Sequence, residues 1–233
     1  EEKIWRKKRL DNLARWKLEG HEKEVWAWHK NNHREYWIEQ GIPEAAIDQH
    51  KLGYCYTKSL KLKTGEIVTL PVYTMPIWNP VTRELENIQY RLCNPPAGES
   101  KYRQEPFIPA SAAFMNGNMD GTAIFVEGFK KAIIVYNFIG SQRQVVGFPS
   151  KLPGRELLLT QCSQFKKIYV VFDPDAYHAD APGGVSAIER LGKILPGKVW
   201  AITMPVKVDD AIVKYGMSQS TFRSYFTIAE RLK

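Results

Sequence analysis

The sequence predicts an α/β protein: a parallel sheet flanked by helices, preceded by a small mixed α+β subdomain with a basic face and by a helical N-terminal extension. Three observations predict this class. From Ala123 onward, apolar runs alternate with amphipathic segments, which is typical of strands and helices in a parallel sheet. Between Leu52 and Leu92, apolar runs are separated only by turn residues, which favours antiparallel strands. Before residue 40, tryptophans recur among charged residues, as in a helix that packs on its neighbours.

The composition is that of a folded chain. The 233 residues suffice for one large domain or two small ones, and 44% hydrophobic with 25% charged residues exclude a disordered or collagen-like chain. The longest apolar runs fall far short of the ~18 residues of a membrane-spanning helix, so we expect no membrane partner. No charged-then-apolar secretion signal opens the chain, and because it begins without methionine we expect a fragment of a longer protein.

Cysteine content and charge narrow the class further. Three distant cysteines (Cys55, Cys93 and Cys162) exclude a disulfide framework and an all-cysteine zinc site, and they favour a reducing, cytoplasmic location. The formal net charge of +8 favours a polyanionic partner. Residues 1–122 carry 18 basic and 16 acidic side chains, whereas residues 123–233 carry 15 and 9, so most of the basic excess lies in the C-terminal half.

Apolar spacing and breaker residues define the elements before residue 122. We expect residues 1–40 to form the helical extension, with a break at Gly20, and a second short helix to run from Pro43 to about His50. Residues 41–121 are expected to form the mixed α+β subdomain. Its predicted strands are Ile67–Leu70, Thr74–Trp78 and Glu86–Leu92. A Pro- and Gly-rich loop after the last strand leads into a basic segment.

Residues 122–216 are expected to form the parallel-sheet domain, and residues 217–233 a C-terminal helix. The predicted strands of this domain are Ala123–Val126, Val145–Val146, Ile168–Phe172 and Val199–Thr203. The predicted helices cover residues from Phe129 to Phe138, a segment after Pro153, a segment ending at Leu195 and a segment after Asp209.

Acidic side chains follow two of the predicted parallel strands. Glu127 comes directly after the first strand, and Asp173 and Asp175 follow the most apolar one. Functional groups gather beyond the carboxyl ends of parallel strands, so these carboxylates converge if their strands are neighbours about 4.8 Å apart. Converging carboxylates raise one another's pKa unless a hard divalent cation such as Mg2+ neutralises them. Acidic residues in such positions also cap helices, so a purely structural interpretation stays open.

Three acidic motifs occur in a fixed order along the chain. They are Ile124-Phe125-Val126-Glu127-Gly128, then Val170-Val171-Phe172-Asp173-Pro174-Asp175-Ala176, then Lys207-Val208-Asp209-Asp210. This order resembles the Toprim domain, which bacterial-type primases, topoisomerases and some nucleases share. Upstream, residues 36–54 and 76–102 resemble the segments that precede Toprim in the RNA-polymerase core of bacterial-type and phage or plasmid replicative primases. The resemblance covers residues 36 to 216 and implies a Toprim-like sheet.

The resemblance also implies a role for each acidic residue. Glu127, Asp173, Asp175 and Asp210 would be catalytic, and the metal ligands would be these four residues together with Asp209. They would hold Mg2+ or Mn2+ in a two-metal site that transfers nucleotides from nucleoside triphosphates.

Six further residues would contact the nucleotide or the template strand. They are Arg91, Lys101, Tyr102, Arg103, Lys130 and Lys131. Arg and Lys neutralise phosphates whatever the base sequence, and aromatic rings stack on single-stranded bases. Basic side chains at a surface also serve solubility, so this interpretation stays open as well.

Two departures from the family pattern leave the function open among three hypotheses. Lys131 stands where these primases commonly carry an acidic side chain, and Val208 stands where the third motif often has its first Asp. The leading hypothesis is a primase core that makes short RNA primers on single-stranded DNA, with a replicative helicase as a further partner. The alternatives are a catalytically altered Toprim module that binds single-stranded nucleic acid, and a Toprim nuclease.

No phosphate-binding Gly-x-x-x-x-Gly-Lys-Ser/Thr motif occurs in the sequence, which excludes a helicase or ATPase motor that uses this motif.

Overall fold

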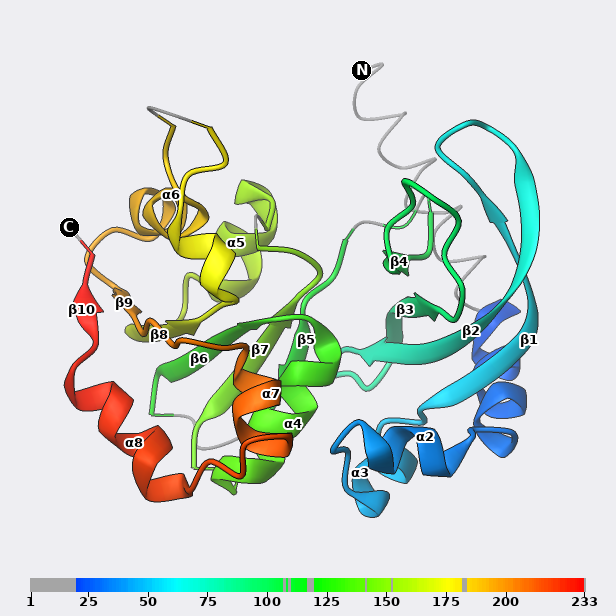
Figure 1. The fold of residues 1–233 in the computed structure, drawn as a ribbon, viewed down its shortest axis with the longest axis horizontal. Helices are drawn as coiled ribbons and strands as arrows, with labels where there is room; N and C mark the ends of the chain where they lie inside the picture. Colours follow the sequence, from blue (N-terminus) through cyan, green and yellow to red (C-terminus); the bar gives the residue numbers. More distant parts are fainter. Residues whose placement is uncertain are drawn as a thin grey trace. The chain divides into compact units, whose positions relative to one another are not determined.

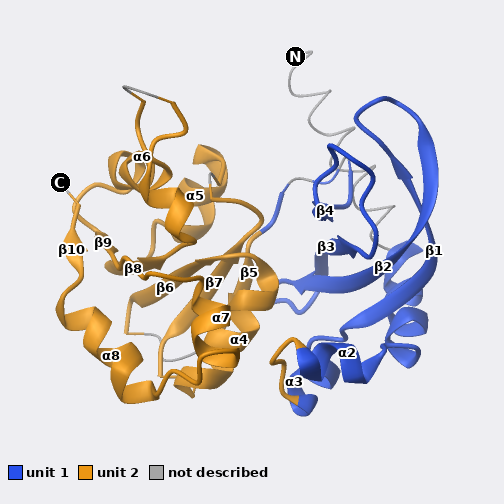
Figure 2. Ribbon diagram, in the orientation of Figure 1, with its two compact units in different colours: residues 1–39, 44–111 blue, residues 40–43, 112–233 orange. Residues whose placement is uncertain are grey.

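The chain separates into two compact units, which are described one at a time. A computed structural model describes residues 20–106, 108, 110–116, 120–140, 142–151, 153–181 and 184–232. Unit 1 comprises Glu1–Glu39 and Glu44–Ser111, and unit 2 comprises Gln40–Pro43 and Ala112–Lys233 (Figure 2). The predicted N-terminal extension lies outside the described residues up to residue 19, and residues 20–30 are helical.

Unit 1 is built on an antiparallel sheet in the order β1-β2-β3-β4 (Figure 1). Its strands are β1 Gly53–Lys61, β2 Ile67–Trp78, β3 Leu85–Leu92 and β4 Tyr102–Gln104, and its short helices are α2 Arg34–Glu39 and α3 Glu44–Gln49. Apolar residues of β1, β2 and β3 form a buried core together with Val25. The sheet therefore packs its apolar face against the preceding helical segment.

The sequence prediction divided β2 into two strands, whereas the structure has one continuous strand. Pro71, between the two predicted strands, has no N–H group to donate and normally weakens a strand. In the structure, β1 carries a register shift between Cys55 and Lys58, opposite Pro71. The irregular backbone of β1 at this point needs no hydrogen bond from Pro71, so β2 continues through the proline.

A buried carboxylate, Glu105, connects β3 to β1 within unit 1. Its Oε2 accepts hydrogen bonds from the Tyr90 hydroxyl at 2.6 Å and from Lys58 Nζ at 2.9 Å. His21 Nε2 lies 3.6 Å from Oε1 of the same carboxylate. Burial alone would raise the pKa of Glu105, but the hydrogen bonds from His21, Tyr90 and Lys58 outweigh it and lower this pKa to about 2.

Unit 2 contains the parallel sheet, in the order β10-β9-β8-β6-β7-β5. Its strands are β5 Ala113–Met115, β6 Thr122–Glu127, β7 Gln144–Phe148, β8 Lys167–Val171, β9 Val199–Ala201 and β10 Glu230–Arg231. The four central strands are parallel, and β5 and β10 pair antiparallel with β7 and β9 at the two edges. The predicted Toprim-like parallel sheet is thus present, with edge strands that the sequence patterns did not predict.

Helices cover both faces of this sheet (Figure 1). They are α4 Phe129–Ile139, α5 Arg155–Cys162, the 3-10 helix η1 Pro174–Tyr177, α6 Ala187–Ile194, α7 Val208–Val213 and α8 Gln219–Thr227. Helices α5 and α6 lie on one face, where they pack with Phe125 and Val170 in a large apolar core. Helices α4, α7 and α8 lie on the other. Helical structure was expected throughout residues 217–233, but it ends at Thr227 and β10 follows.

Among the described residues, none of the helices combines the length and the apolar character that crossing a bilayer would require.

We predict that Glu105 is a main source of stability in unit 1. Changing Glu105 to Gln leaves Lys58 without its buried counter-charge and should lower the free energy of unfolding by about 3 kcal/mol at pH 7. Urea unfolding followed by tryptophan fluorescence would measure this, because six of the seven tryptophans belong to unit 1. The exposed Glu66→Gln change is the matched control and should shift stability by less than about 0.5 kcal/mol.

The difference between wild type and Glu105→Gln should also depend on pH. Because the pKa of Glu105 is lowered on folding, its contribution is complete above about pH 4.5 and disappears as the pH falls toward about 2. The two stability curves should therefore converge in acid. A difference that stays constant from pH 7 to pH 2 would show that the effect is one of packing and not of charge.

Candidate metal centre

Two neighbouring parallel strands place the acidic residues at one edge of the unit 2 sheet. In the β6–β8 ladder, Val126 lies opposite Val171, so the residues that follow them leave the sheet at the same level. Glu127 is the last residue of β6, and Asp173 lies between β8, which ends at Val171, and η1. Because neighbouring parallel strands end at the same edge of a sheet, this register places Glu127 and Asp173 close together beyond the strands.

Gly128 allows α4 to begin immediately after Glu127. Its φ angle of 94° lies in the region that favours glycine, while its N–H donates to the Phe148 carbonyl at 2.6 Å. Pro174 plays a similar part after Asp173, because a proline fits the first position of a helix and helps to turn Asp175 back toward Asp173. The local sequence thus bends the chain sharply at both carboxyl ends.

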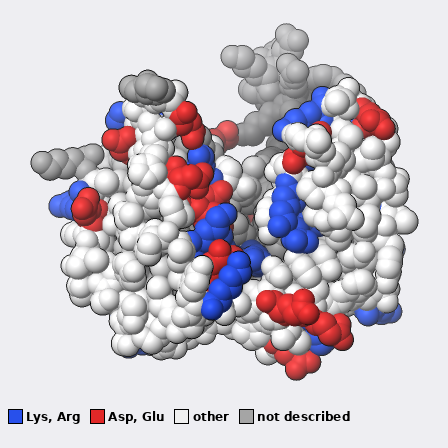
Figure 3. All heavy atoms as spheres, in the orientation of Figure 1, with Lys and Arg blue, Asp and Glu red and all other residues white. Residues whose placement is uncertain are grey.

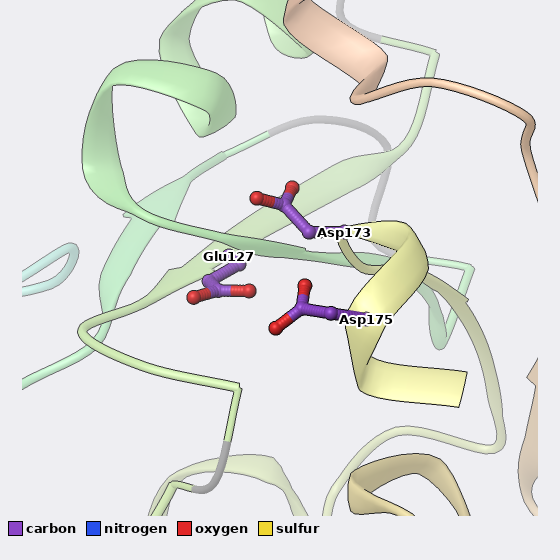
Figure 4. Close-up of side chains that lie close together, drawn as sticks. All are labelled: Glu127, Asp173 and Asp175. Carbon is purple, nitrogen blue, oxygen red and sulfur yellow. The ribbon is translucent and has the colours of Figure 1, made fainter. Parts of the chain in front are cut away.

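The structure brings Glu127, Asp173 and Asp175 together. A carboxylate oxygen from each lies within 4.8 Å of the others, and the close-up shows the side chains converging from β6 and from the segment that enters η1 (Figure 4). Asp173 is buried, Glu127 is half-buried and Asp175 is exposed. The group is therefore open to solvent on one side, as an ion with several water ligands requires.

The environment of the Glu127 carboxylate indicates whether the three carboxylates fit a metal ion. Among the described residues, its Oε2 is buried and has no hydrogen-bond partner. Burial and, secondarily, the neighbouring Asp173 raise the pKa of Glu127. A buried carboxylate oxygen without a donor is costly, and a divalent cation would satisfy it, so the donor set fits Mg2+ or Mn2+.

Lysines surround the acidic group and compensate its charge. Lys131 Nζ donates to Asp173 Oδ1, and Lys207 Nζ lies 2.9 Å from Asp173 Oδ2. Lys151 Nζ contacts Asp175 Oδ2 at 3.0 Å, and its hydrogen bond holds the pKa of Asp175 below its usual range. In the space-filling view, acidic and basic side chains of unit 2 touch one another in a strip instead of forming an all-acidic surface (Figure 3).

Sequence reasoning missed the roles of Lys207 and Lys151. Lys207 belongs to the third acidic motif, and its position two residues before the Asp pair was the only signal that could have found it. Lys151 follows β7 in a segment without any recognisable motif, and it reaches Asp175 and Asp180 from 24 and 29 positions away in the chain. Only the folded sheet shows that these three residues meet.

Asp209 and Asp210 are not part of the acidic group among the residues that the structure describes. Lys130 Nζ lies 3.0 Å from Asp209 Oδ2, and Lys214 Nζ lies 2.9 Å from Asp210 Oδ1. Burial favours the protonated form of Asp209, but the charge of Lys130 outweighs this effect and the pKa of Asp209 is lowered. Each Asp of α7 is thus engaged by a lysine, and the five predicted ligands do not form one group.

The predicted nucleotide-contacting residues Arg91, Lys101, Tyr102 and Arg103 lie in unit 1. Arg91 lies opposite Tyr102 in the β3–β4 ladder, and its guanidinium lies 5.1 Å from the Tyr36 ring centre and 5.6 Å from that of Tyr73. Arg103 donates to the Glu99 carboxylate and to the Lys61 carbonyl. Its charge is therefore already compensated, which makes Arg91 the better candidate of the two for a phosphate contact.

Comparison with known proteins identifies the fold. No family model matches the chain, and no curated protein matches it by sequence. Among solved structures, the chain is similar to the zinc-binding and RNA polymerase domains of Aquifex aeolicus primase, with 16% identity and a TM-score of 0.68 over 90% of this chain. It spans 60% of that chain.

Two further primase structures share the fold. A DnaG primase catalytic domain bound to single-stranded DNA gives a TM-score of 0.66 at 10% identity, over 94% of this chain and 83% of that one. The RNA polymerase domain of Mycobacterium tuberculosis DnaG, in complex with double-stranded DNA, gives 0.64 at 15% identity, over 92% and 80%. The chain therefore has the fold of DnaG-type primase catalytic cores, and the resemblance found in the sequence is confirmed at this level.

We predict that the acidic group binds Mn2+ and that Asp175 is needed for it. Asp175→Asn removes an accessible ligand oxygen and should weaken Mn2+ binding about tenfold or more. Electron paramagnetic resonance of free Mn2+ would measure the dissociation constant. Asp180→Asn is a matched control, because it removes the same charge and the same Lys151 contact outside the acidic group, and it should change affinity less than about threefold. Equal losses in the two variants would contradict a specific ligand role.

Proposed function

We propose that this chain is a primase-type nucleotidyltransferase core that synthesises short RNA primers on single-stranded DNA with Mg2+ or Mn2+. The observation that carries the proposal is the Glu127–Asp173–Asp175 group at the carboxyl edge of β6 and β8, in a fold shared with DnaG-type primase cores. At this level of sequence identity the structural likeness supports the fold, and the acidic group supports the chemistry.

The proposed mechanism assigns a task to each residue of the centre. A divalent ion held there would neutralise the triphosphate and favour attack of a 3′-hydroxyl on the α-phosphate, with release of pyrophosphate. Asp173 is fixed by Lys131 and provides a rigid ligand, while Glu127 offers its buried Oε2 and Asp175 approaches from the solvent side. Lys207 and Lys151 reach the group from segments outside it, and their ammonium groups would turn to phosphate oxygens when a nucleotide arrives.

The proposed partners follow from charge and from the structural neighbours. Two DnaG neighbours are described with single-stranded and double-stranded DNA, and another neighbour is the primase fragment of the bacteriophage T7 primase-helicase. The net charge of +8 supports a polyanionic partner. We therefore propose a single-stranded DNA template, nucleoside triphosphate substrates and a replicative helicase as partners. Arg91 and Tyr102 would contact the template or nucleotide from unit 1.

One observation favours a second candidate function. Lys131, Lys207 and Lys151 compensate the charge of the acidic group, so the same fold could hold single-stranded nucleic acid as a module that has lost catalysis. Primer synthesis separates the two candidates, because only a catalytic core makes product.

We predict that the purified chain, given mixed-sequence single-stranded DNA, labelled nucleoside triphosphates and Mg2+ or Mn2+, makes short RNA oligomers. Glu127→Gln and Asp173→Asn should each lower the yield at least about 100-fold, because each removes a negatively charged ligand that would hold the divalent ion. Asp180→Asn serves as the control and should stay near the wild-type yield.

Three outcomes would overturn parts of this proposal. Unchanged primer synthesis by the Glu127→Gln and Asp173→Asn variants would show that these two residues do not have the catalytic roles proposed for them. Salt-sensitive DNA binding without any product would support the binding module. Metal-dependent shortening of the DNA in the absence of nucleoside triphosphates would show a nuclease instead.

A further inference from the structure

The carboxylates at the edge of the unit 2 sheet fall into two sets, which differ in how firmly lysine side chains are paired with them. In the first set, toward α7, Lys130 pairs with Asp209 and Lys131 pairs with Asp173. In the second set, a carboxylate oxygen from each of Glu127, Asp173 and Asp175 lies within 4.8 Å of the other two. The neighbouring lysines Lys130 and Lys131 both come from the first turn of α4, which begins right after Glu127.

The lysines of the first set are fixed in place. Lys131 is only 9% exposed and belongs to the buried side of α4, a helix that packs against β7 and α7. The side chain of Lys130 is also largely covered, and it contacts Gln40 at 3.3 Å in addition to Asp209. Moving a buried ammonium away from its carboxylate would leave two buried charges unpaired, which costs several kcal/mol.

Lys207 and Lys151, which contact Asp173 and Asp175 in the second set, can be displaced from these carboxylates. Each of these ion pairs has one exposed partner: the side chain of Lys207 is 55% exposed, against 7% for Asp173, and that of Asp175 is 67% exposed, against 23% for Lys151. Because the exposed partner of each pair regains contacts with water on release, an arriving divalent ion displaces these pairs at a lower cost than the pairs of Lys130 and Lys131. Displacement would free Asp173 Oδ2 and Asp175 Oδ2, which then join the buried Glu127 Oε2 as ligand oxygens.

We infer that the centre holds a single divalent ion between Glu127, Asp173 Oδ2 and Asp175, and that Lys131, supported by Lys130, is a built-in cation in place of a second ion. This inference rests on the proposed function and makes it more specific, since a two-metal site was expected from the sequence. Lys131 stays hydrogen-bonded to Asp173 Oδ1, and the positive charge of Lys131 also acts on Asp209. A second ion near these carboxylates would therefore meet an ammonium group where it needs ligands. Repulsion between these cations excludes the second ion.

Mn2+ titration of the full chain without nucleotide or DNA tests the inference by stoichiometry. Electron paramagnetic resonance should show one bound Mn2+ per wild-type chain, and Asp175→Asn should weaken the binding of this ion about tenfold or more. Lys131→Glu exchanges the ammonium for a carboxylate beside Asp173, and it should raise the stoichiometry to two. Two ions in the wild type, or none, would overturn the inference, and so would a single ion in a folded Lys131→Glu variant.

Two milder variants keep the test decisive if Lys131→Glu does not fold. Lys131→Met preserves the length of the side chain and removes a competing cation, so the single Mn2+ should bind about tenfold more tightly. Lys207→Met removes an exposed and displaceable cation, and it should tighten binding by no more than about threefold. Equal effects of these two variants would show that Lys131 is an ordinary neighbouring charge.

The titration is independent of the proposed activity. Primer synthesis by a chain that binds two ions would support the proposed function and refute the built-in cation. One bound ion in a chain that makes no primers would support the built-in cation and refute the proposed function.

Discussion

Repulsion among carboxylates at the carboxyl edge of β6 and β8 is the constraint on which the rest of the centre depends. The parallel register of these strands forces Glu127 and Asp173 into the same space, and η1 adds Asp175. Three negative charges within 4.8 Å are unfavourable unless positive charge is brought to them. Every other feature of the site, from the lysines of α4 to the free oxygen of Glu127, is a response to this repulsion.

The sheet supplies the rigidity that holds such a group together. Val126, Val170 and Val171 are fully or almost fully buried directly before the acidic residues, so the strand ends cannot move apart without losing apolar packing. Gly128 and Pro174 then turn the chain, which places the carboxylates beyond the strands instead of continuing the ladder. Apolar burial in the sheet thus opposes the electrostatic strain at its edge.

Each unit contains a buried carboxylate, and the two carboxylates are stabilised in different ways. Glu105 in unit 1 is saturated with donors, and the pKa of this group is lowered to about 2 because His21, Tyr90 and Lys58 all bond to it. Glu127 in unit 2 has a buried oxygen without a donor, and its pKa is raised. A saturated carboxylate is a structural element, whereas an unsaturated one beside an open face is ready to bind a cation.

The sequence by itself determined the parallel-sheet class, the order of the acidic motifs and the position of Glu127, Asp173 and Asp175 at strand ends. These features are local, because apolar runs define the central strands and the acids follow at their ends. That the three carboxylates meet was decided by the pairing of β6 with β8, which β7 separates in the chain. Tertiary structure alone decided that β2 runs through Pro71 and that short strands complete both edges of the unit 2 sheet, since each depends on a partner strand distant in sequence. It also decided that Asp209 and Asp210 pair with lysines and that Lys151 and Lys207 join the acidic group. Charge pairing depends on distance in space, and no local pattern encodes contacts between residues so far apart in the chain.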